Sequence, residues 1–99
     1  MVKKIDIISF LRENKLVFER DFNVSKIGLM GSFSRDEDRV DSDIDVIVEF
    51  KLGTVDLSKT KEKLRKTIQK KFGRKVDLCR ARYLKPYFKS RILKDAIFV

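Results

Sequence analysis

Hydrophobic positions along the chain change from helical to strand spacing and back several times. Lys3 to Glu13 and Lys15 to Phe22 place apolar residues three and four positions apart, which predicts two short helices in succession. Ser25 to Met30 is rich in strand-forming residues and is followed by glycine, so we expect a first strand there. Asp36 to Ser42 is an acidic stretch with the composition of a loop.

A second strand, a longer helix and a third strand are predicted next. Asp43 to Phe50 contains the apolar run of a strand. The helix after it would be capped by Asp56 or Ser58 and would end at Gly73, which accepts the backbone conformation of a helix end. Lys75 to Cys79 then predicts a short buried strand.

The C-terminal segment predicts one more helix and a strand end. Pro86 fits the first turn of a helix, where its missing N–H is no loss. The residues expected to face inward from this helix are Phe88, Ile92, Leu93 and Ala96. Ile97 to Val99 would dock as the end of a strand. The order of elements therefore predicts an α+β fold, with helices packed on a small mixed sheet, in a single domain of residues 1–99.

Composition limits the classes of protein that this fold can serve. Apolar residues make up 42% and charged residues 39% of the 99-residue chain, so we expect it to fold. No apolar run has the ~18 to 20 residues of a membrane span, and the N-terminus is amphipathic, so we expect a cytoplasmic protein without a membrane partner. A lone cysteine, Cys79, allows no internal disulfide, and the absence of histidine excludes imidazole catalysis.

The net charge of +9 is concentrated in the middle of the chain, where residues 51–82 hold 12 basic and three acidic residues. Such a block can attract nucleic acid, a nucleoside triphosphate or an acidic protein, and it is also the ordinary composition of a solvated helix face. Nucleic acid is the less favoured ligand, because only Tyr83 and Tyr87 are candidates for stacking on bases. We expect both tyrosines to pack at the last helix instead.

Two polar clusters lie at the ends of the first two strands. Gly31 lets the backbone approach a ligand, and Ser32 can cap a following short helix and donate its hydroxyl to a phosphate. Asp43 and Asp45 share one face of a strand while Ile44 points into the core. Paired carboxylates favour a shared hard cation such as Mg²⁺ or Mn²⁺. Together the clusters predict nucleotidyl transfer; either cluster alone could be an ordinary strand end.

A third carboxylate, Asp77, interrupts the apolar run of the third predicted strand. Burying it without a partner or a metal would be unfavourable, so we expect it to converge with the other two. Asp43 and Asp45 would then hold the metals that bridge the triphosphate. Asp77 would hold the second metal and help to activate the attacking hydroxyl. The three residues predict a two-metal catalytic site.

These motifs resemble the minimal nucleotidyltransferases of the DNA polymerase beta superfamily. The residues that carry the resemblance, which covers nearly the whole chain, are Gly31-Ser32, Asp43-x-Asp45, Asp77, and the segments from Gly73 to Leu78 and from Pro86 to Ala96. The resemblance implies a polymerase beta-like core, with Gly31 and Ser32 at the triphosphate and the three aspartates as metal ligands. It also implies a partner, because such proteins typically act as antitoxins of a small helical HEPN ribonuclease toxin. Members of the family transfer AMP from ATP to a tyrosine of the toxin.

The segment after Ser32 departs from the family in one place. The family often has glycine after the position of Arg35, whereas this chain has Asp36. Arg35 is a candidate ligand for phosphate, and a salt bridge with the neighbouring acids is the alternative.

The short chain leaves no room for a domain that grips the base and the acceptor, so both should depend on a partner or on a second copy of the chain. The favoured function is Mg²⁺-dependent transfer of AMP from ATP to a hydroxyl of a partner protein. One alternative is a binding-only antitoxin, in which the basic helix from Ser58 to Lys71 covers the toxin and the site is vestigial. The other is a nucleic-acid-binding module.

Overall fold

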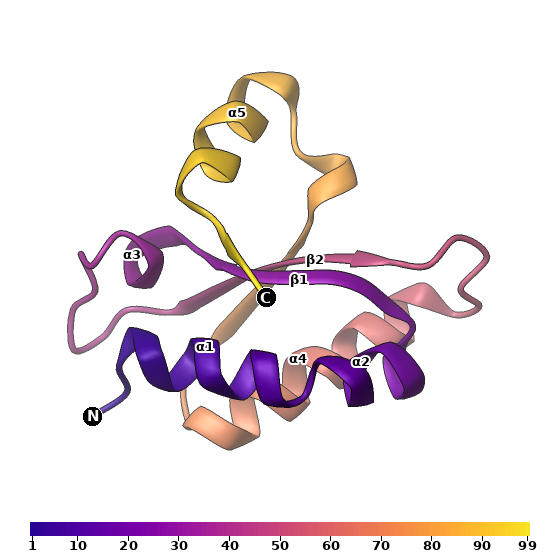
Figure 1. Cartoon of the computed structure of the whole chain (residues 1–99), viewed down its shortest axis with the longest axis horizontal. Helices are drawn as coiled ribbons and strands as arrows, with labels where there is room; N and C mark the ends of the chain where they lie inside the picture. The colour runs from indigo at the N-terminus through magenta and orange to yellow at the C-terminus, as the bar shows by residue number, and fades with distance from the viewer.

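A sheet of four strands forms the centre of the molecule, and helices cover its two faces unequally (Figure 1). The structure is a computed structural model that describes residues 1–99. In chain order the elements are α1 (Lys4–Glu13), α2 (Lys15–Phe22), β1 (Val24–Met30), α3 (Gly31–Ser34), β2 (Ile44–Phe50), α4 (Leu57–Phe72), β3 (Val76–Arg80), the 3₁₀ helix η1 (Ala81–Tyr83), α5 (Pro86–Asp95) and β4 (Ile97–Phe98).

The strand order in the sheet is β3-β2-β1-β4, so β3 and β4 lie at the edges. β1 pairs antiparallel with both β2 and β4, whereas β2 and β3 are parallel and are joined through α4. The register sets Asp45 of β2 opposite Met30 of β1 on one side and opposite Asp77 of β3 on the other. The sheet thus brings together residues that are far apart in the sequence.

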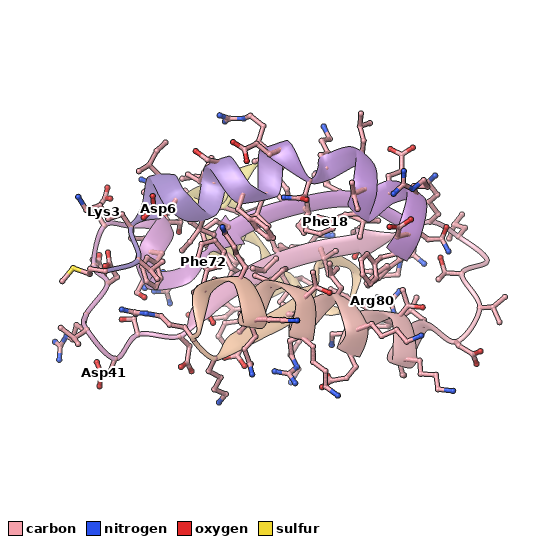
Figure 2. The ribbon with its side chains drawn as sticks, turned by 90° about the horizontal axis from the view of Figure 1, so that it is seen from below. Lys3, Asp6, Phe18, Asp41, Phe72 and Arg80 are labelled. Atoms are coloured by element: carbon pink, nitrogen blue, oxygen red, sulfur yellow. The ribbon has the colours of Figure 1, made fainter.

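The hydrophobic core lies between one face of the sheet and a layer made by α1, α2 and α4, which Figure 2 shows from below. Leu64 and Ile68 of α4 are fully buried in this core. The rings of Phe10 and Phe18 pack edge to face with centroids 6.0 Å apart, and those of Phe10 and Phe72 with centroids 5.3 Å apart. The opposite face of the sheet carries α5 (Figure 1), so only the first face is covered by a full helical layer.

The predicted α+β fold is confirmed, and most predicted elements are present within one residue of their expected bounds. The C-terminal strand end is also present, since β4 pairs with β1 and the Val99 N–H donates to the Ile27 carbonyl at 3.1 Å. Asp56 immediately precedes α4, but it has a left-handed φ of 50° and its side chain forms no capping hydrogen bond. None of the helices combines the length and apolar character needed to span a lipid bilayer.

The C-terminal helix differs from its prediction. No residue of α5 is buried, and Phe88, which was expected to face inward, is 50% exposed. Tyr83 and Tyr87 are 70% and 71% exposed, although we expected both to pack against this helix. The reason is that α5 stands over the sheet and contacts mainly the short helix α3 and strand β1, with no helical layer around it (Figure 1). The 3₁₀ helix η1 before it was not predicted.

Candidate active site

Buried aliphatic and half-exposed acidic residues alternate at the start of β2. Ile44 and Val46 are fully buried in the core, whereas Asp45 between them points to the opposite face of the sheet. In the parallel register with β3, Asp45 lies beside Asp77. The structure therefore brings two of the three predicted carboxylates together on the face that carries α5.

Gly31 allows the backbone to lie directly against the Asp45 carboxylate. Its φ of +77° is in the left-handed region, which glycine adopts without the steric cost of a side chain. A Cβ atom at this position would overlap the Oδ2 atom of Asp45 and would lie 3.0 Å from the Cβ and Cγ atoms of that residue. The close approach expected of Gly31 is thus an approach to Asp45 itself.

The short helix α3 begins at Gly31, with Met30 as its N-cap residue. Ser32 therefore lies inside the first turn, and our prediction that Ser32 caps this helix was wrong. The hydroxyl that bonds within the turn belongs to Ser34, whose Oγ donates to the Gly31 carbonyl at 2.8 Å. The physical reason is that a cap precedes the first helical residue, and here the helix starts at the glycine itself.

The acidic residues give the site an unfavourable charge balance. Burial raises the pKa of Asp45 above its ordinary value, and the negative charges of Asp77 and Asp43 raise it further. Arg35 opposes the shift in the pKa of Asp45, but less strongly. Ionised Asp45 is therefore destabilised by its surroundings in the absence of a bound cation.

Asp77 and Asp43 are less enclosed than Asp45. Asp77 is exposed because β3 is an edge strand, so the prediction that a buried Asp77 needs a partner or metal was based on a burial that does not occur. The Oδ2 atom of Asp43 lies 3.8 Å from Nζ of Lys75, in a partly exposed ion pair. Cys79, on the same strand and also predicted to be buried, is half-buried for the same reason.

The donor atoms suit a hard divalent cation, although the ligands are not gathered around one point. Carboxylate oxygens are the ligands that Mg²⁺ and Mn²⁺ prefer, and a shared cation relieves the repulsion between neighbouring carboxylates. No group of three metal-ligating side chains is preformed. Asp45 and Asp77, side by side in the register, are therefore the residues best placed to hold a metal, whereas Asp43 is paired with Lys75.

The loop after α3 contains Arg35, a candidate phosphate ligand, and Asp36, the residue that departs from the family pattern. Arg35 is ion-paired, with Nε 3.4 Å from Oε2 of Glu37, and its charge still acts on Asp45. Asp36 has a φ of 58°, in the left-handed region that glycine adopts most readily. Aspartate tolerates this conformation better than most residues.

A hollow of about 700 Å³ lies beside Asp45 and Gly31, within the range of sizes that hold small ligands. Arg35 and Glu37 line it from the loop after α3, and α5 lines it from the other side. Two charged residues of α5, Arg91 and Asp95, also line it. In the sequence they were included only in the segment that carries the family resemblance, with Arg91 as one of its motif residues, and neither was assigned a chemical role. The signal that could have found them is their spacing of three and seven residues from Phe88, which puts them on the same helix face.

Comparison with known proteins shows the family to which this chain belongs. Residues 9–99 match the sequence profile described as the nucleotidyltransferase domain. The chain is a member of this family. The family expected from the sequence, and a nucleotidyltransferase enzyme with it, are thereby confirmed. Nucleotidyltransferases of this family generally use a divalent metal.

Individual relatives cover nearly the same length. The protein adenylyltransferase MntA of Thermococcus cleftensis is 32% identical to this nucleotidyltransferase domain over 95% of this chain and 93% of that protein. A solved structure provisionally named a minimal nucleotidyltransferase is 26% identical, with a TM-score of 0.78 over 97% of this chain and 95% of that one. A crystal structure described as a toxin-antitoxin with AMP-PNP is 25% identical, with a TM-score of 0.67 over 89% and 72% of the two chains.

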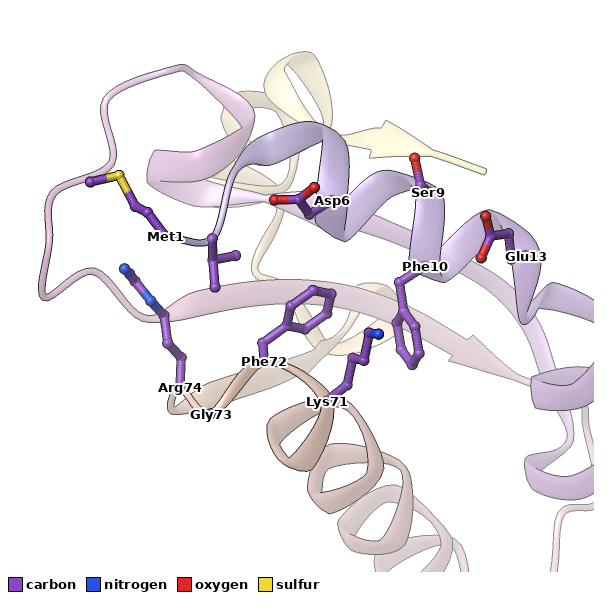
Figure 3. Close-up of a pocket in the computed structure, with 10 residues that line it drawn as sticks. Met1, Asp6, Ser9, Phe10, Glu13, Lys71, Phe72, Gly73 and Arg74 are labelled. Carbon is purple, nitrogen blue, oxygen red and sulfur yellow. The ribbon is translucent and has the colours of Figure 1, made fainter.

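A second hollow of the nucleotidyltransferase domain, about 620 Å³ in volume, lies between α1 and the end of α4 (Figure 3). Its walls include Phe10 and Phe72 with Lys71 between them, and none of the predicted site residues contributes to it. Its position in the helical layer, on the far face of the sheet, separates it from the carboxylates. The hollow beside Asp45 is therefore the candidate active site.

The basic block of the sequence is mainly α4, which carries seven lysine and arginine residues and one glutamate. Most of its cations are exposed on the outer side of the helix. Arg65 pairs with Glu62 and lies with Asp77 in a small hollow at the edge of the sheet. This hollow places residues of the basic helix beside the third predicted carboxylate.

Proposed function

We propose that this nucleotidyltransferase domain, as one domain of residues 1–99, transfers AMP from ATP to a tyrosine hydroxyl of a small helical HEPN toxin. The transfer would use two Mg²⁺ ions, would take place in the cytoplasm and would neutralise the toxin. The observation that carries the proposal is the placement of Asp45 beside Asp77, with the Gly31 backbone against Asp45. Relatives named protein adenylyltransferase, and a similar toxin-antitoxin structure with AMP-PNP, support it.

The proposed roles follow from charge and position. Asp43 and Asp45 would hold the metal ions at the triphosphate, and Asp77 would share the second ion. When bound, Mg²⁺ neutralises charge on the triphosphate and on the leaving pyrophosphate. Gly31 and Ser32 would contact the phosphates through the first turn of α3, and Arg35 would supply a positive charge beside Asp45.

The proposed reaction needs no covalent intermediate with the enzyme. The tyrosine oxygen forms a bond to the α-phosphorus of ATP while the bond from that phosphorus to the pyrophosphate oxygen breaks. The hydroxyl proton passes to Asp77, whose exposed carboxylate at the sheet edge is open to a partner protein. Because the hollow of this chain is open, choice of acceptor would depend on the partner or on a second copy of the chain.

The test is transfer of label from α-³²P-ATP to the purified HEPN partner in the presence of Mg²⁺. We expect the wild-type chain to label the partner, and Asp43→Asn and Asp45→Asn to lower labelling by at least 100-fold, in the range of lost electrostatic catalysis. Asp41→Asn is the matched control, because this aspartate is exposed in the neighbouring loop (Figure 2). Full labelling by both site variants would refute the assigned carboxylates.

A binding-only antitoxin makes a different prediction in the same experiment. The absence of a preformed three-ligand cluster and the exposed basic face of α4 are the observations that favour this alternative. The binding-only alternative predicts that the toxin is neutralised without being labelled, and that Asp45→Asn neutralises it as well as wild type does.

If the partner is labelled, tyrosine-to-phenylalanine variants of the partner distinguish a tyrosine acceptor from another hydroxyl.

A further inference from the structure

One face of α5 lines the candidate active site but has no part in the roles described so far. This face consists of Phe88 and of the residues three, four and seven positions after it, which are Arg91, Ile92 and Asp95. Residues with this spacing lie on the same side of a helix. All four line the hollow whose opposite wall contains Gly31 and Asp45. The helix is thus a wall of the site and is not a buried core element.

Arg91 is the cation of this hollow that is free to bind an anion. It forms no ion pair with any carboxylate of the chain, although Asp95 follows it by one helical turn, whereas Arg35 is held by Glu37 at 3.4 Å. Two cations and three carboxylates line the hollow, a net charge of −1. Without Arg91 the net charge of the walls would be −2, so Arg91 reduces the repulsion that a triphosphate entering beside Asp45 would meet.

Phe88 offers an apolar ring in the same space. Its ring packs edge to face on Tyr87 with centroids 5.4 Å apart, but 50% of the residue stays exposed. Of these two neighbouring aromatic residues, only Phe88 lines the hollow. Aromatic side chains stack on the faces of nucleic-acid bases whatever the base is. Covering this ring with a base would remove the apolar surface that the fold leaves in water.

We propose that α5 completes the nucleotide site, in which the Arg91 guanidinium binds the triphosphate and the Phe88 ring stacks on the base. Guanidinium groups bind phosphate oxygens through two parallel hydrogen bonds, which makes Arg91 more than a point charge. The inference rests on the proposed function, because it takes a nucleoside triphosphate as the substrate. It gives the ligand one end on α3 and the other on α5, two elements that are in contact.

Isothermal titration of the full chain with Mg²⁺-AMP-PNP and with Mg²⁺-tripolyphosphate tests the two contacts separately. Arg91→Gln should weaken both ligands by about 10- to 100-fold, as expected for a hydrogen bond to a charged group. Phe88→Ala should weaken AMP-PNP by about tenfold and leave tripolyphosphate unchanged, because only the nucleotide has a base. The matched controls are Lys94→Gln and Tyr87→Ala, which change the same helix outside the hollow and should stay within about twofold of wild type.

Asp95→Asn distinguishes direct binding from an indirect role of Arg91. Removing this carboxylate should leave AMP-PNP binding unchanged or tighter, because the hollow becomes less negative. Equal weakening by Asp95→Asn and Arg91→Gln would mean that the two residues form a structural pair, and would overturn the proposal. Far-UV circular dichroism of each variant, beside its thermal unfolding, verifies that the helical content and the overall stability remain those of the wild type.

The outcomes also separate this inference from the proposed function. If the wild-type chain binds AMP-PNP and Asp45→Asn abolishes transfer, but Arg91→Gln and Phe88→Ala bind like their controls, the α5 contacts are wrong and the proposed function stands. If the wild-type chain binds neither AMP-PNP nor tripolyphosphate, the proposed function and the α5 contacts are both wrong. Loss of AMP-PNP binding in Arg91→Gln with normal tripolyphosphate binding would overturn the assignment of Arg91 to the triphosphate.

Discussion

Replacing Gly31 with alanine tests whether contact between this backbone and Asp45 sets the activity. The added Cβ would overlap Oδ2 of Asp45 and lie 3.0 Å from the Cβ and Cγ atoms of that residue. Carbon atoms in contact are normally about 3.5 to 4.0 Å apart, so the carboxylate must move by about 1 Å. A displacement of about 1 Å can cost about 100-fold in rate, which corresponds to about 2.7 kcal/mol of transition-state stabilisation.

A second glycine provides the control for this substitution. Gly31 and Gly73 have φ values of +77° and +64°, so alanine at either position should cost about 1 kcal/mol of unfolding free energy through the backbone. A Cβ at Gly73, however, meets no atom within 4 Å. Gly73→Ala therefore reproduces the backbone strain of Gly31→Ala without displacing Asp45.

The assay is AMP transfer to the partner protein, measured beside urea unfolding of each variant. We expect Gly31→Ala to lose about 100-fold in transfer rate and Gly73→Ala to keep the wild-type rate, with similar losses of stability. If the two variants lose activity equally, backbone strain is the cause and the contact with Asp45 is irrelevant. Full activity of Gly31→Ala would refute the reasoning altogether.

Three further predictions concern electrostatics and packing. The raised pKa of Asp45 means that the folded protein binds the carboxyl proton of Asp45 more tightly than the unfolded chain does. The free energy of unfolding therefore falls as the pH rises from the ordinary pKa of an aspartate to the raised pKa of Asp45. Asp45→Asn should therefore have a higher free energy of unfolding than wild type at pH 7 without metal, and this difference should shrink as the pH is lowered. Urea titrations at several pH values measure the difference. A difference that does not change with pH would exclude ionisation of Asp45 as the cause. Gly28→Ala should detach β4, because its Cβ would lie 2.7 Å from the Ile97 carbonyl oxygen, and faster hydrogen exchange at the Val99 amide would report this. Leu64→Ala should cost about 2 to 5 kcal/mol of unfolding free energy, while Leu16→Ala, at a position 79% exposed, should cost almost nothing; equal costs would contradict the assigned core.

The position of Asp45 could be predicted because strand alternation is a local property. Ile44 and Val46 on either side are apolar, which fixes the face that Asp45 occupies once the segment is a strand. The neighbour of Asp45 across the sheet depends instead on strand order. The sequence suggested that Asp77 converges with Asp45, but it did not reveal that β3 pairs with β2 at the edge of the sheet. The edge position is why Asp77 is beside Asp45 and yet exposed.

The start of α3 shows a second limit of sequence reasoning. A glycine followed by a serine suggests a turn in which the serine caps a helix, but the backbone at Gly31 already begins the helix. Position 31 has to be glycine because the Asp45 side chain leaves no space for a Cβ atom there. The requirement comes from a residue on another strand, and no local pattern around Ser32 records it.

In α5 the spacing of apolar residues correctly predicted a helix, but it wrongly predicted that Phe88 would be buried. Phe88 and Ile92 are one turn apart, as in any helix that packs on a core, and the spacing cannot distinguish a core from the wall of a ligand site. Arg91 and Asp95 on the same face do make that distinction, because charged side chains are almost never buried without a partner. A helix face that mixes an aromatic ring, a guanidinium and a carboxylate suits a hollow that contains water or a polar ligand. The apolar stripe of α5 is therefore better understood as part of the site than as a weak part of the core.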